Sequence, residues 1–307
     1  MEKSVKEFSG RTFSPEEIEL IKWTITAYPK LSRWELAGTI CEFLGWAQIS
    51  GKPKARQCIG MLNALEESDL VKLPPLTEGK GKYERQSGSS NASAPAQENK
   101  ENDQSNDVRE CGRVDLALPL SAAENKQWAQ YVRQYHTLGY VTQFGAQLRY
   151  FIRSQGQDLG CLQFSASAWA LAPRDKWIGW TEAQKKARLH LIVNNSRFLI
   201  LPWVHVKNLA SRALSGAVHR IQADWLAAYC YAPVLLETFV DTTQYSGTCY
   251  KAANWEYLGE TQGRGRQDRH SERGVTKKAI YVYPLRRDFR EILEGAKPYK
   301  AVTPDDN

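Results

Sequence analysis

One short segment, at residues 263–274, combines residue types that suit phosphate binding: GRGRQDRHSERG. Arginine presents a planar fork of donors that matches phosphate oxygens, and interleaved glycines let backbone amides approach the same oxygens. Residues 263–290 contain nine lysines and arginines but three acidic residues, so they supply +6 of the net charge of +7. The alternative is a solvated loop whose arginines pair with carboxylates elsewhere. The cations predicted to bind nucleic-acid phosphates in this segment are Arg264, Arg266, Arg269 and Arg273.

Three carboxylates are placed to add chemistry to such a phosphate site. Glu237 and Asp241 are four residues apart in a predicted strand, so both side chains face one side of it. Asp268 lies inside the arginine segment, where the alternative is that it orders the arginines through ion pairs. Glu237 and Asp268 are the candidate ligands of a divalent metal such as Mg²⁺, which polarises a phosphodiester. The candidate catalytic set for cleaving or nicking DNA is Glu237, Asp241, Asp268, His270 and His136.

The histidines and cysteines narrow the enzyme classes. His136 follows a predicted helix and is a candidate general base, with a hydrogen-bonded structural histidine as the competing interpretation. The chain has no GxSxG, HExxH or Walker motif, which argues against serine hydrolases, zinc proteases and P-loop enzymes. Its six cysteines are scattered without a CxxC pair, so neither a disulfide framework nor a zinc site is indicated.

Residues 1–76 are predicted to form a small helical module resembling a winged helix. Ser14, Pro15 and Glu17 together are typical of a helix start with a capping box, and a second helix is expected after Ser32. A third helix follows, and VKLPP at 71–75 is expected to form a small strand. Lys54 and Arg56, at the start of the third helix, are candidate phosphate contacts. The alternative is a module that binds protein.

The rest of the chain divides by composition. Residues 77–113 are rich in Ser, Asn, Gln and Glu, which predicts a flexible linker that tethers the module. Residues 114–295 are predicted to form a mixed α/β domain, and 296–307 a tail. The longest apolar runs are too short to span a bilayer and a signal-peptide core is missing, so we expect a cytoplasmic protein without a membrane partner.

Within the domain, periodicity predicts alternating helices and strands. An amphipathic helix is expected at 123–136, then a hairpin whose turn is QGQDLG, then an extended run at 188–204 that breaks at NNSR. A helix at 208–221, a strand at 232–241, a short helix at 248–255 and two closing strands complete the pattern. Tyr281 and Tyr283 share one face of the last strand, where they suit either base stacking or the core.

Several separated motifs recur in one order: HLIVNNSRFLILPWVHVKNLASRAL, PVLLETFVD, GTCYKAANW, GRGRQDRH and IYVYPL. In these motifs, over roughly residues 120–290, the chain resembles the DruA family of the Druantia anti-phage defence system. The resemblance implies a role in prokaryotic defence or in mobile elements, beside transposases. It also implies a helicase or other subunits of a defence complex as candidate partners.

The element order also resembles the acyl-coenzyme A N-acyltransferase (GNAT) fold, a central mixed sheet flanked by helices. In that fold a loop and the following helix N-terminus hold the coenzyme's pyrophosphate. The family's loop pattern, laid on HVKNLA, places Asn208 where a glycine is expected, although Ala210 fits. Asn208 can adopt a left-handed conformation, but its side chain would crowd a diphosphate. The scaffold is therefore expected without a working coenzyme A site, and Lys207, Asn208 and Arg212 become candidate nucleic-acid contacts.

We therefore expect a DNA-binding protein of anti-phage defence or mobile elements, with DNA favoured over RNA. Nicking chemistry with Mg²⁺ is one extension of this hypothesis. The first alternative is a GNAT-type acyl or aminoacyl transferase that uses coenzyme A. The second is a non-catalytic assembly subunit.

Overall fold

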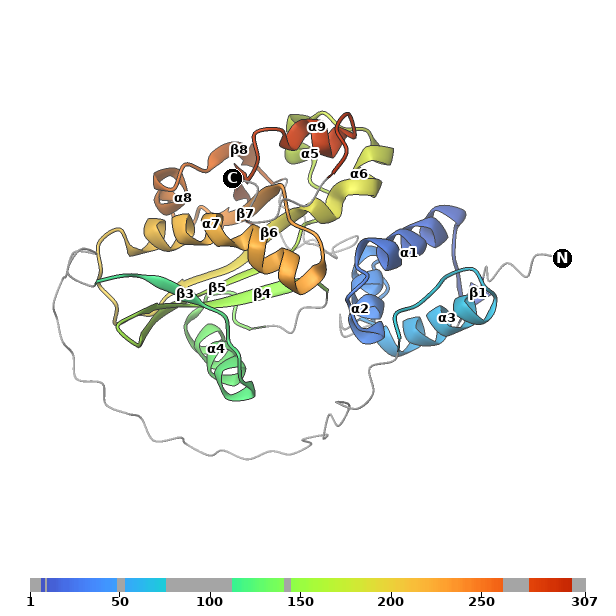
Figure 1. Cartoon of the computed structure of the whole chain (residues 1–307), viewed down its shortest axis with the longest axis horizontal. Helices are drawn as coiled ribbons and strands as arrows, with labels where there is room; N and C mark the ends of the chain where they lie inside the picture. Colours follow the sequence, from blue (N-terminus) through green and yellow to red (C-terminus); the bar gives the residue numbers. More distant parts are fainter. Residues whose placement is uncertain are drawn as a thin grey trace.

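The computed structural model describes residues 7, 8, 10–48, 53–75, 112–140, 145–261 and 276–299. Within them, a seven-stranded mixed sheet with helices on both faces forms the larger part of the molecule, and a smaller helical module lies beside it (Figure 1). The predicted mixed α/β class, with a central sheet flanked by helices, is therefore confirmed. No helix in these ranges is both long and apolar enough to cross a membrane.

The helices of the module begin where their capping residues predict. Ser14 Oγ accepts a hydrogen bond from Glu17 N, and the Glu17 carboxylate accepts one from Ser14 N. Ser32 and Glu35 repeat this capping box. The strand predicted at 71–75 is wrong: that stretch has no regular structure, and the module's small hairpin precedes the first helix instead. The elements are β1 Glu7–Phe8, β2 Arg11–Thr12, α1 Pro15–Ala27, α2 Arg33–Phe43 and α3 Ala55–Glu67.

The sheet follows the order β3-β4-β5-β6-β7-β9-β8. Neighbouring strands are antiparallel except β6 and β7, which are parallel. The predicted hairpin is confirmed, but its turn is shorter than predicted, because β5 already begins at Gln157. Gln155 and Gly156 both have positive φ, as a two-residue turn between twisted strands requires. The strands are β3 Asp115–Ala117, β4 Gln147–Ser154, β5 Gln157–Ala166, β6 Ile192–Ile200, β7 Leu235–Asp241, β8 Glu256–Glu260 and β9 Lys278–Pro284.

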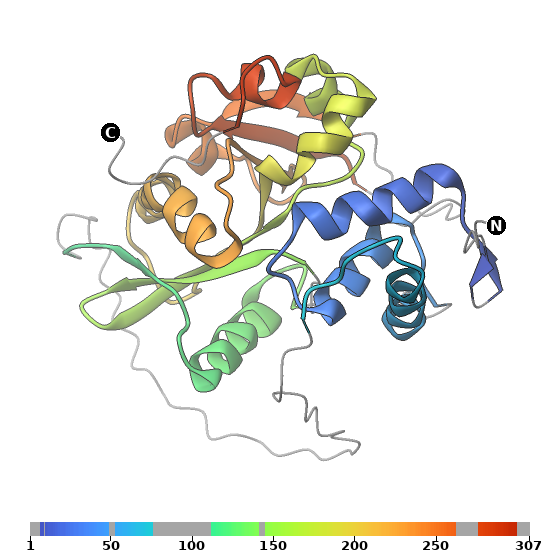
Figure 2. The same ribbon diagram turned by 45° about the vertical axis from the view of Figure 1, so that its right-hand side comes forward.

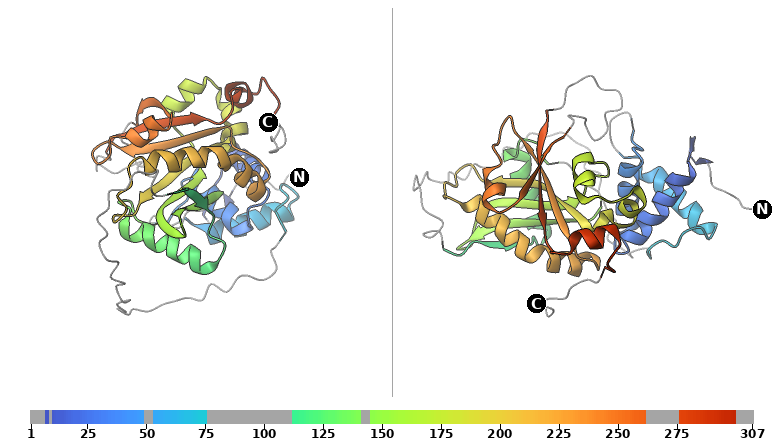
Figure 3. Two further views of the ribbon diagram at one scale, coloured as in Figure 1. Left: turned by 60° about the vertical axis from the view of Figure 1, so that its left-hand side comes forward. Right: turned by 90° about the horizontal axis from the view of Figure 1, so that it is seen from above.

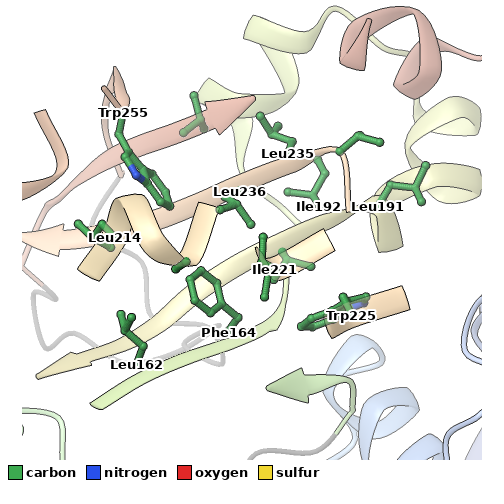
Figure 4. Packing of buried hydrophobic residues seen from close by; sticks show 14 of the residues in the cluster. Leu162, Phe164, Leu191, Ile192, Leu214, Ile221, Trp225, Leu235, Leu236 and Trp255 are labelled. Carbon is green, nitrogen blue, oxygen red and sulfur yellow. The ribbon is translucent and has the colours of Figure 1, made fainter. Parts of the chain in front are cut away.

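Two long helices cover opposite faces of the sheet (Figure 3). Helix α7 (Leu209–Tyr229) packs Leu214, Ile221 and Trp225 onto apolar side chains of β5, β6 and β7, which makes the main core (Figure 4). Helix α4 (Ala122–Tyr135) covers the other face with Trp128, whose indole Nε1 donates to the Tyr150 carbonyl at 3.0 Å. Both helices were predicted from their apolar periodicity.

Shorter helices close the ends of the sheet. The predicted short helix after β7 is α8 (Thr248–Ala252). Sequence periodicity did not identify α5 (Ala172–Ile178) or α6 (Glu182–Arg188), which lie with α9 (Phe289–Glu294) at one end of the sheet (Figure 1). A 3₁₀ turn, Leu189–Leu191, leads from α6 into β6.

The module packs against the domain, with α1 beside α6 (Figure 2). The rings of Trp23 and Phe43 lie 6.0 and 5.4 Å from the ring of Trp169 in the domain. The ring of Tyr28 lies 6.2 Å from that of Tyr231. The module is therefore docked through aromatic contacts, which corrects the expectation of a module that is only tethered. Apart from residues 112 and 113, the predicted linker at 77–113 falls outside the described residues.

Candidate functional site

Strands β6 and β7 separate after four residue pairs. Ile192–Asn195 pair with Leu235–Thr238, after which β6 continues against β5 and β7 continues against β9. The NNSR sequence is therefore not the predicted break in a strand: it marks the point where a continuous β6 leaves β7. Ligands of open α/β sheets bind beyond the carboxyl ends of parallel strands, so this diverging end is the first candidate for a site.

Side chains fill the point where the two strands part. The Tyr250 hydroxyl on α8 donates to Asn195 Oδ1 at 2.7 Å, and Thr238 Oγ1 donates to the Asn195 carbonyl at 3.0 Å. The Phe198 ring lies 6.2 Å from the Tyr250 ring. Burial raises the pKa of Tyr250, so its phenol stays protonated and keeps its donor role. This network fixes the divergence of the strands.

Beyond β6, the chain reaches the start of α7 through a loop that ends in a basic, exposed stretch. Asn208 has φ 62°, the left-handed conformation that its residue type allowed. Its side chain makes no capping hydrogen bond, so it leaves the orphan amides of the first turn uncapped. Lys207, Asn208 and Arg212 are all exposed. The structure thus presents these three predicted contacts at the positive end of the helix dipole.

The end of β7 and the start of β9 lie opposite each other. Asp241 pairs with Lys278, and its Oδ1 accepts hydrogen bonds from Thr243 Oγ1 and N at 2.6 and 3.1 Å. Its Oδ2 accepts from Thr276 Oγ1 at 3.2 Å. These hydrogen bonds, led by the one from the Thr243 side chain, hold the pKa of Asp241 below its usual value. Asp241 is thus an ionised carboxylate that ties the chain after β7 to the start of β9.

The flanks of the arginine segment lie at this same end of the sheet. Thr261 N donates to the Lys278 carbonyl at 2.9 Å, and Thr276 bonds Asp241 at the end of β7. The segment between them, with six of the predicted site residues, lies outside the described residues: Arg264, Arg266, Asp268, Arg269, His270 and Arg273. Its attachment points nevertheless show that the chain enters and leaves it at the carboxyl end of β7.

Glu237 has a structural partner in place of the expected metal. Arg174 Nη1 donates to its Oε2 at 2.8 Å, and the Ala168 amide donates to its Oε1 at 2.9 Å. Both Glu237 and Arg174 have 0% exposed side-chain surface. Four residues of strand separate Glu237 from Asp241 by about 13 Å, so the two carboxylates do not form a shared site. Both oxygens of Glu237 thus accept hydrogen bonds inside the protein, as expected of a buried structural ion pair.

Metal ligands do not gather elsewhere in the structure that is described. Among the residues placed there, no three of His, Cys, Asp and Glu lie close enough to hold one ion. The sequence also did not predict that Arg174 pairs with Glu237, because an arginine in a short helix is ordinarily exposed to solvent. The expected Asp268 ligand remains outside the described ranges.

His136 ends α4 and makes a local hydrogen bond. Its Nδ1 accepts from Leu138 N at 3.1 Å, which places the proton of the neutral ring on Nε2. Burial, and secondarily the charge of Arg197, lowers the pKa of His136 to about 4. The ring is therefore neutral at neutral pH. This geometry matches the hydrogen-bonded structural histidine that the sequence left open as an alternative to a general base.

On the module, Lys54 is half-buried at the start of α3, and Arg56, the second residue of that helix, is exposed. A hollow beside α2 and α3 is lined by Arg33 and Glu66 among others. The Arg33 guanidinium donates to the Pro74 carbonyl, to Asn63 and to Glu66, so its donors are occupied inside the protein. This hollow therefore does not suit a phosphate, and Lys54 and Arg56 remain the predicted contacts on the module.

Comparison with known proteins identifies one family. The family model described as "Druantia protein DruA" matches residues 64–273, which is more than half of the chain. No curated protein matches the chain. The resemblance expected from the sequence motifs is therefore confirmed.

Solved structures that are similar to the domain include acetyltransferases. The aminoglycoside acetyltransferase AAC(6')-Ib in complex with coenzyme A has 12% identity and a TM-score of 0.37, over 59% of this chain and 99% of that one. An N-acetyltransferase from Staphylococcus aureus Mu50 has 8% identity and a TM-score of 0.36, over 56% of this chain and 98% of that one. The activities in these names belong to those proteins. The strand order and the diverging parallel pair of this chain itself agree with the GNAT-like sheet expected from the sequence.

Proposed function

The chain belongs to the DruA family, and we propose that it acts in anti-phage defence by binding nucleic acid. The proposed site is the carboxyl end of β6 and β7, and the proposed ligand is DNA in preference to RNA. One observation carries the proposal: exposed and half-buried basic residues from two separate parts of the chain lie at this end of the sheet. Lys207 and Arg212 come from the start of α7, and Lys277 and Lys278 from the start of β9.

The arginine segment supports the same assignment through its attachment points. Thr261 and Thr276, which flank it, are tied to Lys278 and Asp241 at the end of β7. The segment that joins these two threonines contains four arginines, and the first turn of α7 adds backbone amides at this end of the sheet. A polyanion that spans both groups of cations can neutralise several charges at once.

The proposal is tested by the salt dependence of DNA affinity. Each phosphate contact that is lost flattens the plot of log affinity against log salt by about 0.9 for duplex DNA. The Lys207→Ala/Arg212→Ala double variant should therefore flatten the slope by about two units, and the triple alanine variant of Arg264, Arg266 and Arg269 by up to about three. Electrophoretic mobility shift at several salt concentrations measures this.

A matched control removes two exposed cations from the other end of the sheet. Lys176 on α5 and Arg287, beyond the carboxyl end of β9, are both exposed. The Lys176→Ala/Arg287→Ala variant loses the same net charge, so its slope should stay at the wild-type value. Equal flattening in both double variants would show a general charge effect and would contradict a site at β6 and β7.

A second candidate, acyl transfer from coenzyme A, is favoured by the diverging strands and the uncapped start of α7. Asn208 stands where the family loop pattern has glycine, so Asn208→Gly should strengthen coenzyme A binding if the loop is otherwise competent. Isothermal titration of wild type and Asn208→Gly with coenzyme A tests this. Binding of DNA by both proteins, with coenzyme A bound by neither, would leave nucleic-acid binding as the function.

Nicking is a separate extension of the proposal and depends on Asp268. End-labelled duplex incubated with Mg²⁺ reports it, and Asp268→Ala is the informative variant. Strand cleavage that disappears in Asp268→Ala would support the extension, whereas cleavage that persists would show that this carboxylate is not required.

A further inference from the structure

Two segments without acidic residues meet at the loop that precedes α7. Residues 125–157 and 183–223 contain no aspartate or glutamate. The first segment includes most of α4, and the second includes β6, the loop at 201–208 and most of α7. The loop and α4 contact each other through Trp203 and Tyr135. The two segments in contact therefore carry no negative side chain of their own, and Asp158, which interacts with Tyr131, is paired with Arg153.

Trp203 is the exposed aromatic residue of this surface. The residue is 44% exposed, although tryptophan is usually buried. Its ring lies 5.2 Å from the Tyr135 ring and 6.3 Å from the Tyr131 ring, in both cases edge to face. Tyr131 in turn lies 6.4 Å from the buried Phe151. Trp203 is thus supported from beneath by α4, which limits the ordering entropy lost when a flat ligand stacks on it.

The neighbouring charges show which flat ligand fits. Trp203 and Lys207 lie in one loop, four residues apart, so their Cα atoms are at most about 14 Å apart. Arg212 follows in the first turn of α7 and is exposed, as is Lys207. An aromatic ring beside cations matches a nucleotide, whose base stacks while its phosphate pairs. Bases in a duplex are already stacked on one another, so only an unpaired base can use the ring.

We propose that Trp203, backed by Tyr135 and Tyr131, stacks on an unpaired base of a single-stranded nucleic acid whose phosphates are held by Lys207 and Arg212. This inference rests on the proposed function and specifies its substrate class as single-stranded or locally opened nucleic acid. The β6-to-α7 loop then contributes both the base contact and the phosphate contact.

The test compares three variants on two probes. The probes are a fluorescein-labelled single strand of about 20 nucleotides, longer than one typical binding site, and the duplex of the same sequence. Base stacking on an aromatic ring is worth about 1–3 kcal/mol, so Trp203→Ala should weaken single-strand binding roughly 5- to 150-fold. Trp203→Phe keeps an aromatic face and should restore most of the affinity. Trp34→Ala is the matched control, because Trp34 is 45% exposed on the module beside Glu66 and Glu67.

The salt slope separates stacking from charge. Trp203→Ala should lower single-strand affinity at every salt concentration without changing the slope, whereas Lys207→Ala should flatten the slope by about 0.7 on single strands. Duplex affinity should be unaffected by Trp203→Ala. Unchanged single-strand affinity, or an equal loss on duplex and in Trp34→Ala, would overturn the stacking role while leaving phosphate binding intact. Failure of wild type to bind either probe would instead overturn the proposed function itself.

Discussion

Arg174 and Glu237 form an ion pair in which neither side chain reaches solvent. Removing one partner of such a pair leaves a buried charge uncompensated, which typically costs about 3–5 kcal/mol. Glu237→Ala and Arg174→Ala should therefore each lower the free energy of unfolding by about that amount in urea denaturation. Glu19→Gln is the control, because Glu19 pairs with Lys22 at the surface and surface ion pairs are worth about 1 kcal/mol or less.

The same variants separate a structural from a catalytic Glu237. A Glu237→Ala protein as stable as wild type would contradict the structural assignment. Nicking that is lost in such a stable variant would return Glu237 to the candidate metal ligands.

At the scale of residues, the sequence predicted the local properties of single residues better than it predicted which residues pair with each other. It predicted the left-handed tendency of Asn208, because asparagine tolerates positive φ through its short polar side chain. It did not predict that Glu237 is neutralised, because the arginine that pairs with it lies 63 positions away, on a helix too short to show periodicity. The sequence did not predict a binding role for Trp203, because a single aromatic residue in an apolar run is typical of a buried core position. The absence of acidic residues around it was the available signal.

At the scale of elements, the Asn195–Tyr250 hydrogen bond holds the diverging strands to α8. Tyr250→Phe removes the donor and leaves the buried Asn195 Oδ1 without it, which costs about 1–3 kcal/mol. We expect the free energy of unfolding to fall by that amount, measured by urea denaturation. Tyr257→Phe, at an exposed position on β8, should change it by less than about 0.5 kcal/mol. Equal stability of Tyr250→Phe and wild type would mean that the network does not fix the strands.

Elements with strong local signals were predicted, and those set by distant contacts were not. A capping box located α1, a serine start located α2, and two extended runs around a glycine-containing turn located the β4–β5 hairpin. The polar NNSR sequence was interpreted as a break because exposed strands rarely carry two asparagines. In the structure Asn195 is buried and bonded to Tyr250, 55 positions away. Strand divergence likewise depends on which neighbour each half of β6 pairs with, and local sequence does not encode that choice.

At the scale of the whole molecule, docking of the module connects the two predicted binding regions. Lys54 and Arg56 on the module belong to the same packed body as the domain that carries Lys207. The contact is close: a Cβ added to Gly145 in the domain would lie 2.7 Å from Thr39 Oγ1 on α2. A polar linker in the sequence therefore did not mean an independent module, because linker composition says nothing about aromatic surfaces outside it.

His190 lies between module and domain, and its protonation should loosen them. Its ring contacts those of Trp23 and Tyr28 in the module and lies 5.2 Å from that of Tyr231 in the domain. Its Nδ1 is buried and has no hydrogen-bond partner among the described residues. Burial, and secondarily the charge of Arg188, lowers the pKa of His190 from 6.5 to about 4.

The His190 ring is thus neutral in the folded protein, whereas a solvent-exposed histidine takes up a proton as pH falls below about 6.5. Docking stability should be fully present above about pH 6.5 and should decline as pH falls toward about 4, by up to about 3 kcal/mol. Hydrogen exchange, corrected for intrinsic rates, should show faster exchange of α1 and α2 amides at pH 5 than at pH 7. His190→Phe keeps the ring contacts without a proton site, so its exchange should depend less on pH. An identical pH dependence in His190→Phe would assign the loosening to another group.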